Sequence, residues 1–121
     1  MNKKILIVED DLTLFQIYMD LFIEKGFDVK GAKTGQEAVA LIESEKPDLI
    51  ILDIMLPGGM NGFDVLEKVE ADPNLKKIPV IILTNLDSEE HVAKVIGAKK
   101  YLVKANTTTT EVVSAAMESL A

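Results

Sequence analysis

Acidic, hydroxyl and amine side chains follow four of the short apolar segments of this chain. The run Glu9-Asp10-Asp11 follows the first of these segments, and Asp53, Thr84 and Lys104 each follow a later one. Clustered carboxylates repel one another, so such a group either takes up protons or recruits a hard divalent cation with oxygen ligands. These side chains can act together only if the fold brings the ends of their segments to one place.

Mg²⁺ is the cation expected for a group of this kind, because it needs few protein ligands and keeps several of its waters. Asp10, Asp53 and a backbone carbonyl near Met55 are the expected ligands, with Glu9 acting through a water molecule. The acidic residues therefore predict a magnesium site.

The same residues contain the parts needed for phosphoryl transfer. A carboxylate held beside Mg²⁺ can attack phosphorus and form an aspartyl-phosphate. The metal, the Lys104 ammonium and the Thr84 hydroxyl would offset the charge of that group.

Five short apolar runs predict the strands that position these residues. Ile5–Val8, Leu49–Leu52 and Val80–Leu83 have no polar alternation, which is typical of interior parallel strands covered on both faces. Phe27–Val29, bounded by Gly31, and Tyr101–Val103 are predicted as flanking strands.

Between these runs the apolar period changes to that of an amphipathic helix. Asp11 is expected to begin the first helix, and Gly26 to follow its end. Thr34 with Glu37 and Thr108 with Glu111 have the spacing of a capping box. The apolar positions assigned to the helices are Leu14, Ile17, Tyr18, Leu21, Phe22, Ala38, Leu41, Ile42, Val65, Leu66, Val69, Val92, Val95, Ile96, Val113, Ala116, Met117 and Leu120.

A strand followed by a helix, five times over, predicts an open parallel sheet with helices on both faces. In such sheets ligands bind beyond the carboxyl ends of the strands, at the point where the strand order switches. The acidic, hydroxyl and amine residues that follow the strands are therefore expected at a single rim of the sheet.

The composition fits one domain spanning residues 1–121. The chain has no cysteine. Its net charge is −7, so it lacks the positive field that carries most binding to nucleic acid or anionic membranes. The first apolar run is too short for a signal peptide or a membrane span, so we expect a cytoplasmic protein with proteins, metals or small ligands as partners. His91, the single histidine, is interpreted as a solvated surface residue.

The sequence closely resembles the receiver domain of two-component response regulators over essentially its whole length. The acidic pair of that family resembles Glu9-Asp10 in the run Ile-Leu-Ile-Val-Glu-Asp-Asp, and its phosphoacceptor resembles Asp53 in Leu-Asp-Ile-Met-Leu-Pro-Gly. Its conserved hydroxyl and lysine resemble Thr84 and Lys104, and its aromatic switch residue resembles Tyr101.

The resemblance implies a flavodoxin-like, doubly wound α/β fold with five parallel strands in the order 2-1-3-4-5 and five helices. It also implies that Asp53 accepts a phosphoryl group from a sensor histidine kinase or a phosphotransfer protein, in a reaction that needs Mg²⁺. Thr84 and Lys104 would then move toward the phosphoryl group, and Tyr101 would change rotamer. The output would be an altered surface for a downstream effector protein, with no classical enzymatic activity.

Several positions depart from the family pattern. Ala105 replaces the usual proline after the lysine, and Asn85 is bulkier than the usual residue after the threonine. The loop Gly58–Gly62 is one residue longer than usual and the segment Thr84–Lys104 two residues shorter, so a shortened fourth helix or a shortened loop after it is expected. Lys99-Lys100 and the lack of arginine argue against the dimer of DNA-binding regulators and favour a stand-alone domain, although an excised receiver has the same sequence features.

Three other functions fit parts of the pattern. A pseudo-receiver would be a constitutive interaction module, and the intact set of acidic, hydroxyl and lysine residues argues against it. A flavodoxin-like nucleotide binder would need backbone donors around its phosphate, which Glu9-Asp10-Asp11 would repel. A phosphatase with an aspartate nucleophile would need a substrate-binding cap for which 121 residues leave little room.

Overall fold

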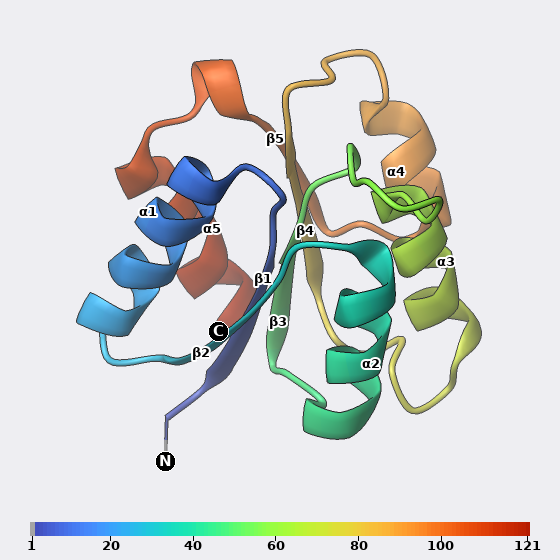
Figure 1. Cartoon of the computed structure of the whole chain (residues 1–121), viewed down its shortest axis with the longest axis horizontal. Helices are drawn as coiled ribbons and strands as arrows, with labels where there is room; N and C mark the ends of the chain where they lie inside the picture. The colour runs from blue at the N-terminus through green and yellow to red at the C-terminus, as the bar shows by residue number, and fades with distance from the viewer. Residues whose placement is uncertain (1) are drawn as a thin grey trace.

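A five-stranded parallel sheet lies between two layers of helices in the computed structural model, which describes residues 2–121 (Figure 1). The strands are β1 (Lys4–Val8), β2 (Asp28–Ala32), β3 (Leu49–Leu52), β4 (Val80–Thr84) and β5 (Lys100–Val103). The helices are α1 (Leu12–Glu24), α2 (Gly35–Glu45), α3 (Gly62–Ala71), α4 (Glu90–Ile96) and α5 (Thr109–Leu120), with a 3₁₀ turn η1 (Lys104–Asn106). The sheet order is β2-β1-β3-β4-β5, which confirms the predicted fold class.

The three interior strands are the three continuous apolar runs, as predicted. β3 and β4 are buried at every position, and β1 at every position after Lys4. Burial on both faces removes the polar alternation that a half-exposed strand would show. The edge strands β2 and β5 are only partly buried.

The predicted limits of β2 were wrong at its carboxyl end. The strand continues through Gly31 to Ala32, which pairs with Val8 of β1. A Cβ atom at Gly31 would lie 2.2 Å from the ring of Phe15. This glycine therefore makes room for the half-buried ring of Phe15 and does not end the strand.

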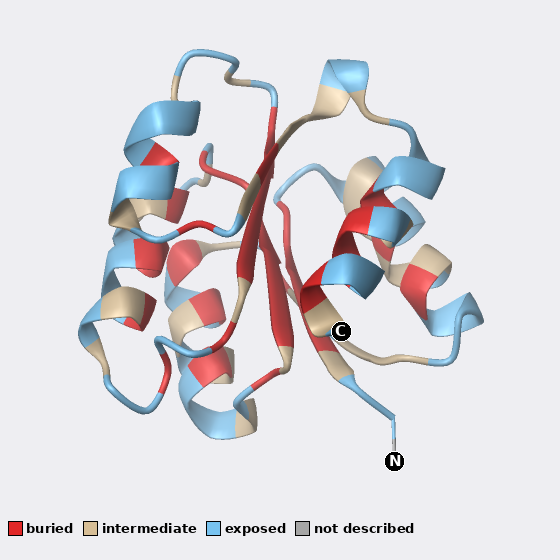
Figure 2. Ribbon diagram, turned by 180° about the vertical axis from the view of Figure 1, so that it is seen from behind, coloured by how far each residue is buried: buried red, intermediate tan, exposed pale blue. Residues whose placement is uncertain are grey.

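Two apolar cores lie on the two faces of the sheet. Figure 1 shows α1 and α5 on one face and α2, α3 and α4 on the other. Alternate residues of each strand divide between them, so that Leu6 joins the core under α2 and α3, while Ile5 joins the core under α1 and α5. Figure 2 shows the same pattern, with buried residues along the strands and on the inner sides of the helices.

Side chains cap most of the helix beginnings. The Asp11 carboxylate accepts a hydrogen bond from the Leu14 amide, as expected of the residue that begins α1. The reciprocal capping box predicted for Thr108 and Glu111 is present at α5. At α2 the Thr34 hydroxyl accepts from the Glu37 amide, but the Glu37 carboxylate accepts from the Lys33 amide, so only half of the predicted box forms.

Three of the four apolar positions predicted for α5 face the core, because Ala116 is buried and Val113 and Leu120 pack against the core, but Met117 does not. Met117 is 54% exposed, whereas Val112 and Ala115 are buried. Apolar residues occur on two sides of this helix, so periodicity alone does not identify the side that packs on the sheet. Helix α4 is similar, because Ala93 is its buried residue and Val95 is 72% exposed.

The helix between β4 and β5 is short, which is one of the two outcomes expected for this segment. Helix α4 has seven residues, against 10 to 13 in the other four helices. Within residues 2–121 no peptide bond is cis, so Lys104 is joined to Ala105 by a trans bond. No helix in this range combines the length and the hydrophobicity that crossing a membrane requires.

Candidate functional site

The predicted site residues lie where β1, β3 and β5 end, at one rim of the sheet. Glu9 and Asp53 directly follow neighbouring strands, and the Asp53 amide donates a hydrogen bond of 3.1 Å to the Val8 carbonyl. The Glu9 amide donates in turn to the Ala32 carbonyl of β2. The sheet ladder therefore fixes the backbone from which both carboxylates project.

A lysine bridges these two carboxylates. The Lys104 Nζ atom lies 2.5 Å from Oε1 of Glu9 and 2.7 Å from Oδ2 of Asp53. The three side chains are 9%, 3% and 4% exposed respectively. Breaking a buried contact of this kind leaves an uncompensated charge, so each of the three groups depends on the others.

Burial and pairing act in opposite directions on these charges. Burial raises the pKa of the Glu9 carboxyl, and its hydrogen bond to Lys104 only partly offsets that effect. Burial disfavours the Lys104 ammonium, but the hydrogen bonds that it donates to Asp53 and Glu9, with their negative charges, outweigh burial, so the pKa of Lys104 is raised. The lysine therefore stays charged at neutral pH.

A third carboxylate completes a set that could hold a metal ion. Glu9, Asp10 and Asp53 each place a carboxylate oxygen within 4.8 Å of the other two. Asp10 is exposed while the other two are buried, so the group has one solvent-facing side. Carboxylate oxygens with room for several waters suit Mg²⁺. The donor set therefore fits the ion predicted from the sequence.

The site opens to solvent through a hollow of about 720 Å³. Met55, on the β3–α3 loop, is 54% exposed there, and its amide donates to Oδ1 of Asp53. That bond holds one carboxylate oxygen of Asp53 while Lys104 holds the other. The hollow is lined by Glu9, Asp10, Asp11, Leu14, Asp53, Ile54, Met55, Leu56, Pro57, Asn61, Asn85, Leu86 and Lys104.

Thr84 and Tyr101 lie near the site but do not line the hollow. Thr84 is fully buried at the end of β4, and its hydroxyl accepts a hydrogen bond of 3.4 Å from the Leu86 amide. The Tyr101 hydroxyl donates to the carbonyl of the same Leu86. Burial raises the pKa of the Tyr101 phenol, which keeps the proton it donates. The backbone of Leu86 thus connects the two side chains.

Gly62, which the sequence analysis did not single out, fixes how closely α3 approaches the site. Its amide donates to the Ile54 carbonyl at 2.8 Å, and a Cβ atom there would lie 2.2 Å from the Asp53 carbonyl oxygen. Asn61 and Asp64 form a complete capping box at this helix start. The sequence signal was an Asn followed three residues later by an acid, a weaker pattern than the one at α5.

The structure thus brings four predicted residues into direct proximity, namely Glu9, Asp10, Asp53 and Lys104. Thr84 and Tyr101 are connected to each other through Leu86, a residue that sequence reasoning missed because only its backbone takes part. His91 is exposed at the start of α4 and takes no part, as expected.

In doubly wound α/β domains, ligands bind beyond the carboxyl ends of the strands at the switch in strand order, and here the acids and the lysine lie at that point between β1 and β3. The model of the response regulator receiver domain matches residues 5–116. The chain belongs to this family. Its members are signalling switches rather than classical enzymes, and they interact with histidine kinases and downstream effectors.

Individual relatives agree with this assignment. Protein PilH of Pseudomonas aeruginosa is 38% identical over 84% of this chain and 84% of its own length. The transcriptional regulatory protein PhoP of Bacillus subtilis is 36% identical over 86% of this chain, but the match spans only 43% of PhoP. A putative response regulator from Chloroflexus aurantiacus has a crystal structure with a TM-score of 0.91 and 30% identity, covering 99% of this chain and 98% of that one.

Proposed function

We propose that Asp53 accepts a phosphoryl group from a phosphohistidine of a sensor histidine kinase or phosphotransfer protein. A carboxylate oxygen of Asp53 would attack phosphorus, the bond from phosphorus to the imidazole nitrogen would break, and the imidazole would leave with that electron pair. The observation that carries the proposal is the buried Lys104 ammonium, within 2.7 Å of Asp53 and beside two further acids.

Magnesium is part of the same proposal. Asp10 and Asp53 would be its protein ligands, together with the Met55 carbonyl, and Glu9 would act through a water. When bound, Mg²⁺ supplies positive charge next to the transferred oxygens. Lys104 would exchange its contact with Asp53 for one with a phosphoryl oxygen, because the carboxylate becomes an uncharged acyl group in the product.

The change would reach the protein surface through Leu86. A new phosphoryl oxygen offers the Thr84 hydroxyl a stronger acceptor than its present environment. Movement of Thr84 would displace the Leu86 amide bound to it, and with it the carbonyl that holds Tyr101. The surface formed by α4, β5 and α5 would change in consequence, and it would bind an effector protein rather than nucleic acid.

The limits of the domain and its location in the cell are also part of this proposal. Residues 1–121 would form one receiver domain acting in the cytoplasm, where phosphohistidine donors form. A constitutive pseudo-receiver is not supported, because Glu9, Asp10, Asp53, Thr84 and Lys104 are all present.

The test is intact-protein mass after treatment with acetyl phosphate or a phosphoramidate. We expect a single phosphoryl adduct that needs Mg²⁺ and is lost in Asp53→Ala. Asp72→Ala, which alters a half-buried aspartate outside the site, is the matched control and should react like the natural chain. Absence of an adduct, where an established receiver reacts, would contradict the proposal.

A further inference from the structure

The tip of the β3–α3 loop, residues 57–60, lies beside the first turn of α2 (Figure 1). The Nε2 atom of Gln36 donates a hydrogen bond of 2.7 Å to the Gly58 carbonyl, which joins residues 22 positions apart. Within residues 2–121, the backbone of the loop tip makes no other hydrogen bond. A side chain of α2 therefore supplies the hydrogen bond that holds this part of the loop.

Met60 packs on the same turn of α2. A Cβ atom at Gly35 would lie 2.7 Å from Cγ of Met60 and 2.7 Å from its carbonyl oxygen, so a glycine is needed there to leave room for the loop. The Met60 side chain also packs against the core under α2 and α3. The loop tip is thus held by packing at Met60 and by a hydrogen bond at Gly58.

The hydrogen bond acts on the most adaptable part of the loop. Gly58 and Gly59 have φ angles of +86° and +84°, and glycine populates positive and negative φ about equally. Two such residues in succession give the loop tip many conformations of similar energy. Fixing one of them costs conformational entropy, which the contact with Gln36 offsets.

The two segments that Gln36 joins both lead to the acidic site. The β3–α3 loop carries Met55, whose amide donates to Oδ1 of Asp53. The start of α2 follows closely after Ala32 at the end of β2, and the Ala32 carbonyl accepts a hydrogen bond from the Glu9 amide. Gln36 therefore connects the loop that carries Met55 to the strands that carry Glu9.

We propose that Gln36 is a positioning residue for the magnesium site, and that its bond to Gly58 keeps Met55 in place beside the acidic group. This inference rests on the proposed function, in which the Met55 carbonyl is a ligand of the ion. When only a fraction of the molecules has the conformation that binds, the apparent dissociation constant rises in inverse proportion to that fraction. An ordered loop avoids this loss.

The test compares Gln36→Met with Gln16→Met. Methionine removes the hydrogen-bond donor, keeps an unbranched side chain and adds no charge. Gln16 is the matched control, because it is also exposed and donates a hydrogen bond of 2.7 Å, but to Asp20 within α1. Both variants should unfold at nearly the natural urea concentration, since both glutamines lie on the surface.

Two NMR measurements separate loop order from metal binding. Backbone amide relaxation without Mg²⁺ should show a loss of order at Gly58 and Gly59 in Gln36→Met. A titration with Mg²⁺ alone, at constant ionic strength, should show a dissociation constant about threefold higher in this variant. That factor is at the lower end of the value of one hydrogen bond, because this bond is exposed. Gln16→Met should match the natural chain in both measurements.

The rate of the phosphoryl reaction gives a further readout. At low Mg²⁺ concentration the adduct of Gln36→Met should form more slowly than that of the natural chain, and saturating Mg²⁺ should restore the natural rate. A rate that stays low at saturating Mg²⁺ would overturn a role exerted through the metal site.

The outcomes distinguish this inference from the function on which it rests. If the natural chain binds no Mg²⁺, the magnesium part of the proposed function is contradicted, and this inference with it. If the natural chain binds the ion but Gln36→Met binds it equally well, or keeps an ordered loop tip, the inference alone is overturned.

Discussion

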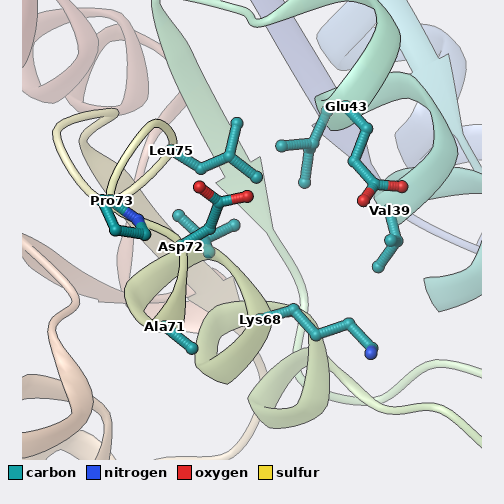
Figure 3. A pocket seen from close by; sticks show the side chains of 9 residues that line it. Val39, Glu43, Lys68, Ala71, Asp72, Pro73 and Leu75 are labelled. Carbon is teal, nitrogen blue, oxygen red and sulfur yellow. The ribbon is translucent and has the colours of Figure 1, made fainter.

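The hollow above Asp53 and a second hollow between α2 and α3 are both open depressions, of about 720 and 500 Å³, but their walls differ. Figure 3 shows the second hollow, where Glu43, Lys68 and Asp72 lie around apolar side chains that include Val39 and Leu75. Its remaining lining residues are Ile42, Val69, Ala71 and Pro73.

The charged groups of the two hollows are held differently. Glu43 and Lys68 are exposed and belong to no ion pair within the described residues, and Asp72 accepts a hydrogen bond from the nearby Asn74 amide. Above Asp53 the charges are buried and bonded to one another. A hollow in the surface is therefore weak evidence of a functional site by itself, whereas buried charged side chains that converge in a hollow indicate one.

The largest difference between the two hollows should come from their lysines. Lys104→Met leaves two buried carboxylates without their cation, and we expect it to lower the free energy of unfolding by about 3–5 kcal/mol at neutral pH. Lys68→Met, its control in the α2–α3 hollow, should change that free energy by no more than about 0.5 kcal/mol. Urea unfolding measures the free energy of unfolding of both variants. Equal losses of stability in Lys104→Met and Lys68→Met would contradict the difference drawn between the two hollows.

The contribution of Lys104 should also depend on pH. Burial alone would lower the pKa of Lys104, but its partners raise it above the ordinary value of 10.5. Because the unfolded chain has the ordinary pKa, this stabilisation is complete below that pH and is lost as the pH rises through the higher folded value. The difference in stability between the natural chain and Lys104→Met should therefore be constant near neutrality and narrow above pH 10.5.

Magnesium should distinguish the acids of the two hollows. At a Mg²⁺ concentration 100-fold above its dissociation constant, the ion should raise the free energy of unfolding by about 2.7 kcal/mol. Asp10→Asn should lose most of that gain, and Asp72→Asn should keep it, because only Asp10 belongs to the three-carboxylate group. Thermal unfolding with and without Mg²⁺ provides the comparison, and an equal gain in both variants would contradict this metal site.

Gly62 tests how strictly the site geometry is set. Gly62→Ala places a methyl group against the Asp53 carbonyl and should cost about 1–3 kcal/mol of stability through local overpacking. The formation of the phosphoryl adduct should also slow, because the backbone that carries Asp53 must shift. Stability is read from urea unfolding and the reaction from intact mass over time; an unchanged reaction rate would show that the close approach of α3 serves packing alone.

The smallest effect is expected in the floor of the α2–α3 hollow. Ile42 is 1% exposed, so Ile42→Val should cost about 0.5–1.5 kcal/mol by leaving a small cavity. Formation of the phosphoryl adduct should proceed at the natural rate. A slowed reaction would show that this hollow is coupled to the site and would weaken the distinction drawn between them.

Local patterns in the sequence were sufficient to predict the order of strands and helices along the chain. The three interior strands follow from apolar runs that need no partner to be recognised, and Asp11 and Thr108 mark helix starts through bonds to residues three positions away. The site residues Glu9, Asp53 and Lys104 were predictable for a related reason. In a parallel sheet, residues that directly follow the strands must meet at one rim.

Tertiary structure decided what depends on distant packing. Gly31 lies within β2, paired with Ile7 of β1, and the Phe15 ring occupies the space that a side chain there would fill. Met117 faces solvent because the sheet selects one of two apolar sides of α5. Lys104 and its partner Asp53 are more than 15 positions apart, and Tyr101 and its partner Leu86 are 15 apart. Leu86 contributes only backbone atoms to its contacts with Tyr101 and Thr84. No local pattern specifies such contacts, because they form only when the strands are aligned side by side.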